Sequence, residues 1–532
     1  MDIKRTILWI IFSFSLLVIW NNWQIEKTQK SDVLLFDNKK PKSEEQTINN
    51  HLSTNSEIIK NNLNIQNSEF TTLENGVLKI TFSNNGAQLV KAELLNYSDN
   101  NKKPISLLNL TDDFTYIVQS GLIGSSSLPN HYSKFNLNYK TQDADKSEAE
   151  FSCEQNGVLL IKKFILENGK YNIQVKHKII NKSENILNSN IYFQIMRDNS
   201  EPTESSRFYN TFTGMAVFSE KEKFQKISFQ DVSKNKAKYI QKTDNGWIAM
   251  VQHYFTTAWI PTENSTRRNE IIELDKNKKI FAIRTIQSLK SIEPNGFLEN
   301  ESQLWVGPQD QNKMASIANG LDLVVDYGIF TIIAKPIFSL MNFIYSFIKN
   351  WGWSIVILTL MIKILFFPLA SKSYRSMSKL KDISPRIQAL RKQYGDDAQQ
   401  FNSAVMEMYR KEKINPLGGC LPILVQIPVF ISLYWVLLSS VEMRGAPWIL
   451  WINDLSTRDP YFILPIVMII TMIIQIKLNP APPDPLQAKI MMIMPLVFGG
   501  MMFFFPSGLV LYWCINNILS IAQQWFITRN IK

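Results

Sequence analysis

The stretch WSIVILTLMIKILFFPLA, residues 353–370, is apolar and long enough to cross a membrane, yet it carries a lysine, Lys363, near its middle. At about 1.5 Å per residue it forms a helix of roughly 27 Å, close to the ~30 Å hydrocarbon core of a bilayer. A cation at that depth costs roughly 2.5 to 3.5 kcal/mol on insertion scales, so it normally faces a bundle interior or a water-filled cavity. An ammonium that extends to the nearby interface is the alternative. It is less favoured because Phe366, Phe367 and Pro368 continue the apolar run.

Four further apolar runs follow this stretch, at residues 417–441, 461–478, 489–505 and 508–527. The segment 372–415 before them holds ten Lys or Arg against five Asp or Glu, which places it in the cytoplasm by the positive-inside bias. The weakly acidic loop 442–460 suits the outer side, and the short proline-rich loop 479–487 returns the chain to the cytoplasm.

The amino terminus adds one more span. Two basic residues precede an apolar run at residues 6–20, but no small-x-small cleavage pattern follows, so residues 1–23 are predicted to be an uncleaved signal-anchor helix. Residues 24–67 are rich in Asn, Ser, Lys and Gln and are predicted to be a flexible linker. The sequence therefore predicts six transmembrane helices with both termini in the cytoplasm.

Composition separates two unlike halves of the 532-residue chain, since a mean hydropathy of −0.09 averages a polar half and an apolar half. The three cysteines lack metal-ligand spacing, and the four histidines all lie in the polar half, so we expect no metal site, no cofactor and no disulfide framework. The sequence has no G-x-x-x-x-G-K-[ST] run, which argues against an ATP site.

Short alternating segments recur between residues 68 and 310 and predict an all-β sandwich outside the cytoplasm. They are residues 77–82, 149–153, 159–166, 171–180, 191–196, 247–252 and 281–286. The aromatic stretch GWIAMVQHYFTTAWIP, residues 246–261, is compatible with a ligand groove, but core packing is favoured because buried aromatics dominate such sandwiches. His253 within it is a lone histidine, and we expect no catalytic role for it.

Residues 311–351 change to a helical period, with a stripe of Ile, Leu, Met and Phe between 337 and 348. This predicts an amphipathic helix in the outer membrane interface. A core helix of the preceding domain is the alternative. Trp351 and Trp353 follow without a linker and suit an interfacial belt, which favours the first interpretation.

Residues 372–415 are predicted to form a cytoplasmic helical hairpin, because Leu380, Ile383, Ile387 and Leu390 repeat by three and four and a Gly-Asp-Asp turn follows. Its basic face is either simply solvated beside anionic lipid or binds a partner. The candidate residues for such binding are Arg386, Arg391, Lys392, Arg410 and Lys411.

Several polar side chains lie inside the predicted spans and are candidates to line one hydrophilic groove with Lys363. They are Thr359, Gln426, Asn516, Asn517 and Gln523. Each has a simpler explanation as an interhelical hydrogen bond, which is worth only about 0.6 to 2 kcal/mol in membrane proteins.

The sequence resembles the YidC-type membrane protein insertases, the family shared with mitochondrial and chloroplast assembly factors, in its Gram-negative form. The resemblance rests on NPLGGCLPILVQIPVF at 415–430, WINDLSTRDPYFILPI at 451–466, FPSGLVLYW at 505–513, and LWVGP at 304–308 with the aromatic stretch above. It implies a periplasmic β-supersandwich at 68–310 and a five-helix insertase core at 352–532. The groove of that core opens to the cytoplasm and to lipid.

The resemblance also implies roles for single residues. Lys363 occupies the position of an arginine in the family's groove, so the positive charge is kept while the bidentate fork is lost. Thr359, Tyr512 and Trp513 match positions where the family contacts the passing substrate helix. The implied partners are nascent membrane proteins, the ribosome or signal-recognition targeting factors at the hairpin, a Sec-type translocon and anionic lipids, with no direct nucleic-acid contact. The implied location is the bacterial inner membrane.

We therefore expect a non-enzymatic insertase that integrates new inner-membrane proteins through a groove carrying Lys363. Two alternatives are a secondary transporter that uses Lys363 as its coupling charge, and a membrane-tethered sugar-active enzyme of mutarotase type. The first would show repeated, interrupted helices, and the second would need paired acid and base residues. The sequence shows neither repeated, interrupted helices nor such an acid and base pair.

Overall fold

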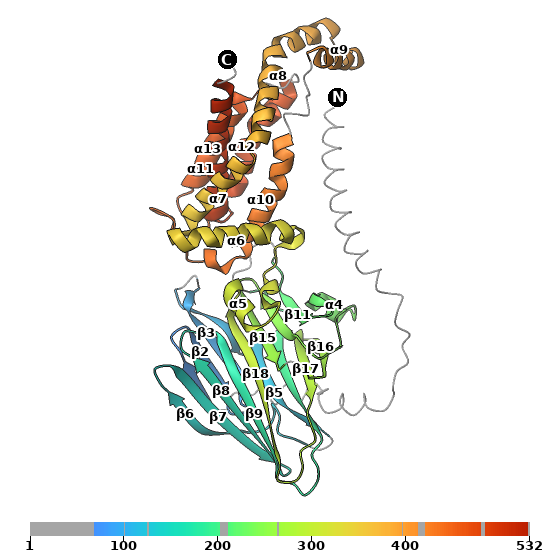
Figure 1. Cartoon of the computed structure of the whole chain (residues 1–532), viewed down its shortest axis with the longest axis vertical. Coiled ribbons are helices and arrows are strands. Elements are labelled where there is room, and N and C mark those ends of the chain that lie inside the picture. Colours follow the sequence, from blue (N-terminus) through green and yellow to red (C-terminus); the bar gives the residue numbers. More distant parts are fainter. Residues whose placement is uncertain are drawn as a thin grey trace.

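The computed structural model describes residues 69–99, 102–124, 127–202, 211–262, 265–395, 397–412, 421–479 and 485–529. A β-sandwich made from the first half of the chain joins a bundle of helices made from the second half (Figure 1). The predicted signal anchor and linker, residues 1–67, lie outside the described residues.

The sandwich consists of two nine-stranded antiparallel sheets. The first has the order β1 (Phe70–Glu74), β2 (Leu78–Ser83), β3 (Gln88–Ser98), β4 (Pro104–Leu110), β5 (Thr115–Gly124), β10 (Ser189–Asp198), β17 (Ile280–Ser288), β16 (Arg267–Asp275), β13 (Lys242–Thr243). The second has the order β12 (Lys223–Ser228), β11 (Gly214–Ser219), β14 (Trp247–Gln252), β15 (Phe255–Pro261), β18 (Phe297–Pro308), β9 (Asn172–Asn181), β8 (Val158–Glu167), β7 (Lys146–Gln155), β6 (Asn136–Gln142).

The core of the sandwich is apolar and aromatic. β8 and β9 alternate buried and less buried residues along their whole length, which is the pattern of strands with one covered face. The aromatic stretch forms β14 and β15, whose side chains are almost all buried, and Trp259 packs on Phe193 with ring centroids 5.0 Å apart. Core packing is therefore confirmed for this stretch. All seven alternating segments of the sequence fall on strands.

The helical half begins with short helices and continues with longer ones. The helices are α4 (Phe229–Ser233, within the sandwich), α5 (Gln311–Ile317), η2 (Leu321–Val324), η3 (Gly328–Phe330), α6 (Thr331–Ile348), α7 (Trp351–Leu365), α8 (Phe367–Tyr394), α9 (Ala398–Lys411), α10 (Leu421–Ser439), η5 (Val441–Met443), α11 (Ile463–Leu478), α12 (Pro485–Met502) and α13 (Ser507–Arg529). Figure 1 shows α6 lying across the ends of α7 and α10 that are nearer to the sandwich.

The bundle helices differ in length, from 15 residues in α7 and 16 in α11 to 23 in α13. Gly328–Ile348 is the one unbroken helix among the described residues that is long and apolar enough to span, and Trp351–Leu365 with Phe367–Ile383 qualifies as a pair bent by 66°. α11 (Ile463–Leu478) is apolar but has only 16 residues, whereas α10 and α12 have 19 and 18. The count of six transmembrane helices therefore stays a prediction.

α8 and α9 pack as a hairpin at the end of the bundle away from the sandwich (Figure 1). Ile383, Ile387 and Val405 are buried between them, with Leu380, Leu390, Phe401 and Met408 packed around. This is the thin apolar seam that the three-and-four spacing predicted. Pro385 lies inside α8 without ending it.

The sandwich and the bundle touch through polar contacts at one seam. Between the β14 and β15 strands, His253 Nε2 lies 3.0 Å from the carbonyl oxygen of Leu438, near the end of α10. Ser439 Oγ donates to the carbonyl oxygen of Asp326 at 2.9 Å, and Arg444 donates to that of Ser98 at 2.7 Å. The last carbonyl groups of a helix lack partners within the helix, so His253 of the sandwich helps to cap α10 at Leu438.

Candidate functional site

Lys363 lies near the end of α7, where α7 packs against α13. Its side chain is half-buried, and its Nζ donates to the Ser520 Oγ at 2.8 Å. Among the described residues no carboxylate pairs with this ammonium. The charge is therefore held by a neutral hydroxyl and is not cancelled by an opposite charge.

One face of α13 carries the groups around Lys363. Tyr512, Asn516, Ser520 and Gln523 follow one another at four, four and three residues, which keeps them on a single helical face. Ser520 Oγ donates its one hydrogen to the carbonyl oxygen of Asn516 at 2.7 Å. A lone pair on the same oxygen accepts from Lys363, so the hydroxyl acts as donor and acceptor at once. Gln523 Nε2 donates to the backbone carbonyl of Lys363 at 3.1 Å.

Asn516 lies on this face with its side-chain Oδ1 shielded from solvent and without a hydrogen-bond partner among the described residues. A buried amide oxygen without a donor loses free energy of about 1 to 3 kcal/mol relative to a paired one. The site next to Lys363 therefore has a free acceptor for a water molecule or for a donor group of a passing polypeptide.

Gln426, Tyr512 and Trp513 form a second group, toward α10 and α12. Gln426 Nε2 donates to the Tyr512 hydroxyl at 3.0 Å. Phe430 lies against both aromatic residues, with ring centroids 6.0 Å from Tyr512 and 4.5 Å from Trp513, and Phe498 of α12 lies 4.6 Å from Trp513. Tyr512 is buried, 1% exposed, whereas Trp513 is half-buried, so Trp513 is the more accessible of the two.

Two residues predicted for the groove lie elsewhere. Asn517 Nδ2 donates to Thr471 Oγ1 at 3.2 Å and so faces α11, as do Cys514 and Gln524 on the same side of α13. Thr359 is 1% exposed, and its hydroxyl donates to the carbonyl oxygen of Ile355 one turn earlier at 2.6 Å. The structure thus brings Lys363, Ser520 and Gln523 together and places Asn516 on the same face of α13. It leaves Asn517 and Thr359 outside that group.

Sequence reasoning missed Ser520 and Phe430. A serine in an apolar helix carries no charge, and its hydroxyl often donates to a backbone carbonyl of the same helix. Its presence alone therefore does not indicate a polar site. The available signal was its position, four residues after Asn516 and three before Gln523, on the face that also carries Tyr512.

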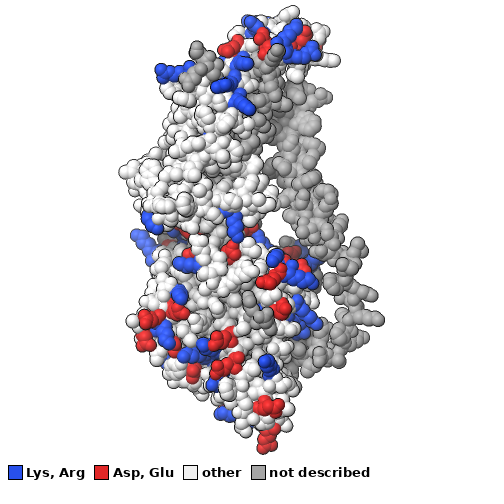
Figure 2. Space-filling model, in the orientation of Figure 1, with Lys and Arg blue, Asp and Glu red and all other residues white. Residues whose placement is uncertain are grey.

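Of the five basic residues predicted for the hairpin, Arg391 is half-buried and the other four are exposed. Arg386 pairs with Glu412 at 2.8 Å, and Lys411 pairs with Glu407 at 2.9 Å. Figure 2 shows Lys and Arg gathered at this end of the molecule and a wide band over the helices where the visible face has almost no charge. Ile364 and Leu365 are among the apolar side chains exposed in the bundle. A charge-free apolar belt bounded by basic residues is typical of a membrane protein.

The sandwich contains buried ionisable groups that are shielded from any sugar in solution. Burial lowers the pKa of Lys162 to about 7 and that of His177 to about 3. Lys162 Nζ donates to the carbonyl oxygens of Gly86 and Ser120, both at 2.7 Å, and Ser120 Oγ lies 2.9 Å from His177 Nε2. Both side chains are 0% exposed, so a substrate in solution cannot reach them. Their hydrogen bonds are structural rather than catalytic.

The family model described as "60Kd inner membrane protein" matches residues 343–532, and the model described as "YidC periplasmic domain" matches residues 71–340. The chain is 52% identical over 556 residues to the membrane protein insertase YidC of Bordetella avium, covering 100% of this chain and 99% of that one. It is 44% identical over 567 residues to that of a Janthinobacterium species, covering 100% and 99%. A crystal structure of an active YidC insertase with its first transmembrane domain resolved matches at 16% identity and a TM-score of 0.40, covering 87% and 96%.

Proposed function

Because this chain belongs to the YidC family of membrane protein insertases, we propose that Lys363 and the polar face of α13 form the hydrophilic path by which it inserts its clients. Insertion of membrane proteins is the function of the chain, and the inner membrane is where it acts. It is an insertase rather than an enzyme.

The observation that carries the proposal is the charge of Lys363, with which no carboxylate among the described residues pairs. A client whose outer segment is acidic loses hydration as it enters the bilayer. The Lys363 ammonium, held by Ser520, attracts that segment, and Asn516, Gln523 and Gln426 offer it amide groups in place of water. These contacts lower the barrier to carrying the segment across.

The apolar helix of the client would leave the path between α10 and α12, past Phe430 and Trp513. Since Tyr512 is buried behind Phe430, it would meet the client only after Phe430 moves. The membrane potential assists an acidic segment that moves outward, by about 2.3 kcal/mol per charge per 100 mV.

We further propose six transmembrane helices, both termini in the cytoplasm, and the sandwich in the periplasm. The basic hairpin and the uncharged belt in Figure 2 support this orientation. The domains would be a signal anchor at 1–23, a linker at 24–67, the periplasmic supersandwich at 68–310, an interfacial region at 311–351 and the five-helix core at 352–532.

The proposed partners follow from the same arrangement. The exposed basic residues of the hairpin at 372–415 suit anionic lipid and the ribosome or a targeting factor that delivers the nascent chain. Association with a Sec-type translocon is proposed for clients with several spans.

The test is the charge at residue 363. Lys363→Glu should reduce insertion of single-span clients with acidic outer tails by about tenfold or more, since attraction becomes repulsion, and Lys363→Arg should retain most activity. Insertion is measured by protease protection of the tail in proteoliposomes, with a client of uncharged tail as the control. Unchanged insertion of the acidic client by Lys363→Glu would contradict the proposal.

A further inference from the structure

A tight turn lies between α10 and α11, at residues 448–452. The N–H of Trp448 donates to the carbonyl oxygen of Ile452 at 2.9 Å, and the N–H of Ile452 donates to that of Ile449 at 3.2 Å. Leu450 is the first central residue of this turn and has a φ of 53°. Turns with a positive φ at that position usually have glycine there, because a side chain is strained in the left-handed region. Strained residues of this kind are concentrated at functional sites.

The tip of the turn is exposed and uncharged. Leu450 is 79% exposed and Ile449 is 38% exposed. Residues 445–453 contain no charged side chain. Single exposed apolar residues are common on protein surfaces, but here the most exposed one also has a strained backbone. Contact with water explains neither the side chain nor the strain.

The turn is fixed to the beginning of α7, the end of that helix nearer to the sandwich (Figure 1). Asn350 Nδ2 donates to the carbonyl oxygens of Pro447 and Trp448, at 3.3 and 3.2 Å. The Trp448 ring lies on Gly352, where an added Cβ would come within 2.2 Å of the ring atom Cδ1. The tip is therefore held at the level of the first residues of α7.

The turn is also fixed to the beginning of α11. Trp451 Nε1 donates to Oδ1 of Asp459 at 3.0 Å. The same carboxylate accepts from the N–H groups of Tyr461 and Leu464, at 3.0 and 2.7 Å, and Asp459 is only 2% exposed. Two helices of the bundle therefore hold the turn in place.

Exposed aromatic residues lie beside the same helix ends. Trp353, in the first turn of α7, is 42% exposed and packs edge-on against Trp448 with ring centroids 5.9 Å apart. Tyr461 before α11 and Phe347 near the end of α6 are also exposed. Aromatic residues of this kind are enriched where a membrane meets water. The turn thus lies at the sandwich-side end of helices whose visible face is almost uncharged (Figure 2).

We propose that Ile449 and Leu450 insert into the membrane and that their partner is phospholipid, at the boundary between headgroups and acyl chains. An uncharged apolar tip can enter this boundary without shape complementarity, whereas a stable protein partner would need about 800 Å² of surface on each side. The leaflet is the outer one because the sandwich is proposed to lie in the periplasm, and this detail rests on the proposed function.

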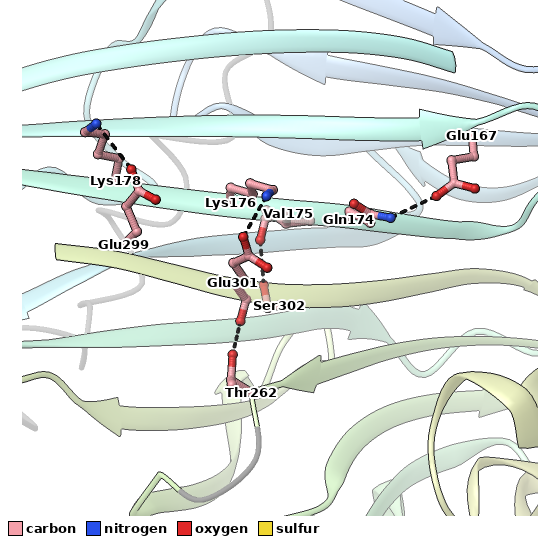
Figure 3. Close-up of polar contacts among 9 residues, drawn as sticks. All are labelled: Glu167, Gln174, Val175, Lys176, Lys178, Thr262, Glu299, Glu301 and Ser302. Carbon is pink, nitrogen blue, oxygen red and sulfur yellow. Dashed lines mark hydrogen bonds and ion pairs between the residues drawn. The ribbon is translucent and has the colours of Figure 1, made fainter. Parts of the chain in front are cut away.

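The sandwich supplies an internal control. Phe297 is 63% exposed, and the Lys178 ammonium lies 4.6 Å from its ring centroid. Figure 3 shows the ion pairs of this face, in which Lys178 contacts Glu299 at 3.2 Å. Lys176 contacts Glu301 at 2.6 Å beside it. Charged groups lose hydration in a bilayer, so we expect Phe297 to stay in water although it is exposed and apolar.

The first experiment places an environment-sensitive fluorescent amino acid at Ile449, Leu450, Leu360 or Phe297 of the full chain. The chain is reconstituted without client in vesicles of phosphatidylethanolamine and phosphatidylglycerol. Lipids with a spin label near the headgroup or near the bilayer centre quench the fluorophore from within the membrane, and iodide on both sides quenches it from water.

We expect the labels at Ile449 and Leu450 to lie about 5 to 10 Å below the headgroups. A label at Leu360, which is exposed and farther along α7, should lie deeper. A label at Phe297 should be quenched by iodide alone. Quenching at Ile449 and Leu450 by iodide alone, or by neither agent as under a second protein, would overturn the proposal.

The second experiment changes the tip. Leu450→Asn introduces a residue that tolerates the left-handed conformation but removes the apolar side chain. With the label at Ile449, quenching by lipid should fall about twofold or more, since binding at the interface scales with the buried apolar area. Leu450→Met is apolar and of similar volume, so it should retain the quenching. An unchanged depth of the label in Leu450→Asn would contradict the assignment of Leu450 as an anchor.

Neither experiment uses a client, so both results are independent of the Lys363 mechanism. Protease digestion of the sandwich in the same vesicles reports its side of the membrane. An error in the proposed orientation is thereby distinguished from a failure of the turn to contact lipid.

Discussion

At the scale of single residues, the position of the Lys363 ammonium depends on one hydroxyl. Lysine has a flexible stem and a point charge, so a neutral partner that fixes it matters more than it would for the planar fork of arginine. Ser520 is that partner, and its own hydrogen is committed to the backbone of Asn516.

Replacing Ser520 tests this dependence. Ser520→Ala removes the acceptor and should lower insertion of clients with acidic tails by about two- to tenfold, because a hydrogen bond to a charged group is worth about 1.5 to 3 kcal/mol and water replaces part of it. Ser520→Thr keeps the hydroxyl and should retain activity. A client with an uncharged tail serves as the control in the protease-protection assay. An equal loss for both clients would indicate a packing defect instead.

Sequence reasoning could find Lys363 but could not assign every polar neighbour. A charge within an apolar run stands out on its own. Asn516 and Asn517, by contrast, are adjacent and identical, yet successive residues of a helix point about 100° apart, and only the neighbouring helices decide which of them meets Lys363. Asn517 meets Thr471 of α11. Ser520 was missed because an uncharged serine is not unusual in an apolar helix.

At the scale of elements, α11 and α12 pack closely at one glycine. A Cβ added at Gly499 would lie 2.1 Å from Cγ1 of Ile469, whereas one added at the next residue, Gly500, would meet no atom within 4 Å. Small residues let membrane helices approach each other closely. The two glycines therefore differ in role although they are neighbours.

Alanine at each position should separate these roles. Gly499→Ala should destabilise the bundle by about 1 to 3 kcal/mol through overpacking, while Gly500→Ala should be neutral or stabilising by up to about 1 kcal/mol of helix propensity. Thermal denaturation of the purified chain in detergent, followed by circular dichroism, measures both. Similar midpoints for the two variants would mean that α11 and α12 do not pack as described.

Two of the strands that sequence reasoning missed are uniform in burial. β5 is buried along nearly its whole length and β6 is exposed along all of it, so neither shows the alternation that marks a strand with one covered face. β8 and β9 alternate clearly and were predicted with nearly correct ends. The helical hairpin was predicted because its seam follows from local spacing alone.

At the scale of the whole molecule, the seam between sandwich and bundle joins residues far apart in the sequence, which no local pattern encodes. Glu442 lies there, just after α10, half-buried, and its Oε2 is shielded from solvent without a hydrogen-bond partner among the described residues. Burial raises the pKa of Glu442 to about 7, with a smaller contribution from Asp310.

The stability of the folded chain should therefore fall as the pH rises from about 4.5 to about 7. Below about pH 4.5 the carboxyl of Glu442 is protonated in both the folded and the unfolded state. Between about 4.5 and 7 only the folded state keeps the proton, so the stability is lost progressively, by up to about 3 kcal/mol. Glu442→Gln should flatten this part of the profile of melting temperature against pH, and Glu299→Gln, an exposed ion-pair residue, should leave it unchanged. A profile that keeps its slope in Glu442→Gln would rule out this carboxyl as its source.

Two of the bundle helices, α7 and α11, are short, which has a consequence for the lipid beside them. α7 has 15 residues and α11 has 16, which correspond to about 22 and 24 Å, several ångströms less than a typical hydrocarbon core of ~30 Å. Hydrophobic mismatch of this kind is relieved when acyl chains compress around the protein. A client segment would then have a thinner barrier to cross beside the insertase than elsewhere. Reconstitution into bilayers of increasing acyl-chain length should progressively slow insertion, and equal rates in all of them would show that the lipid does not deform.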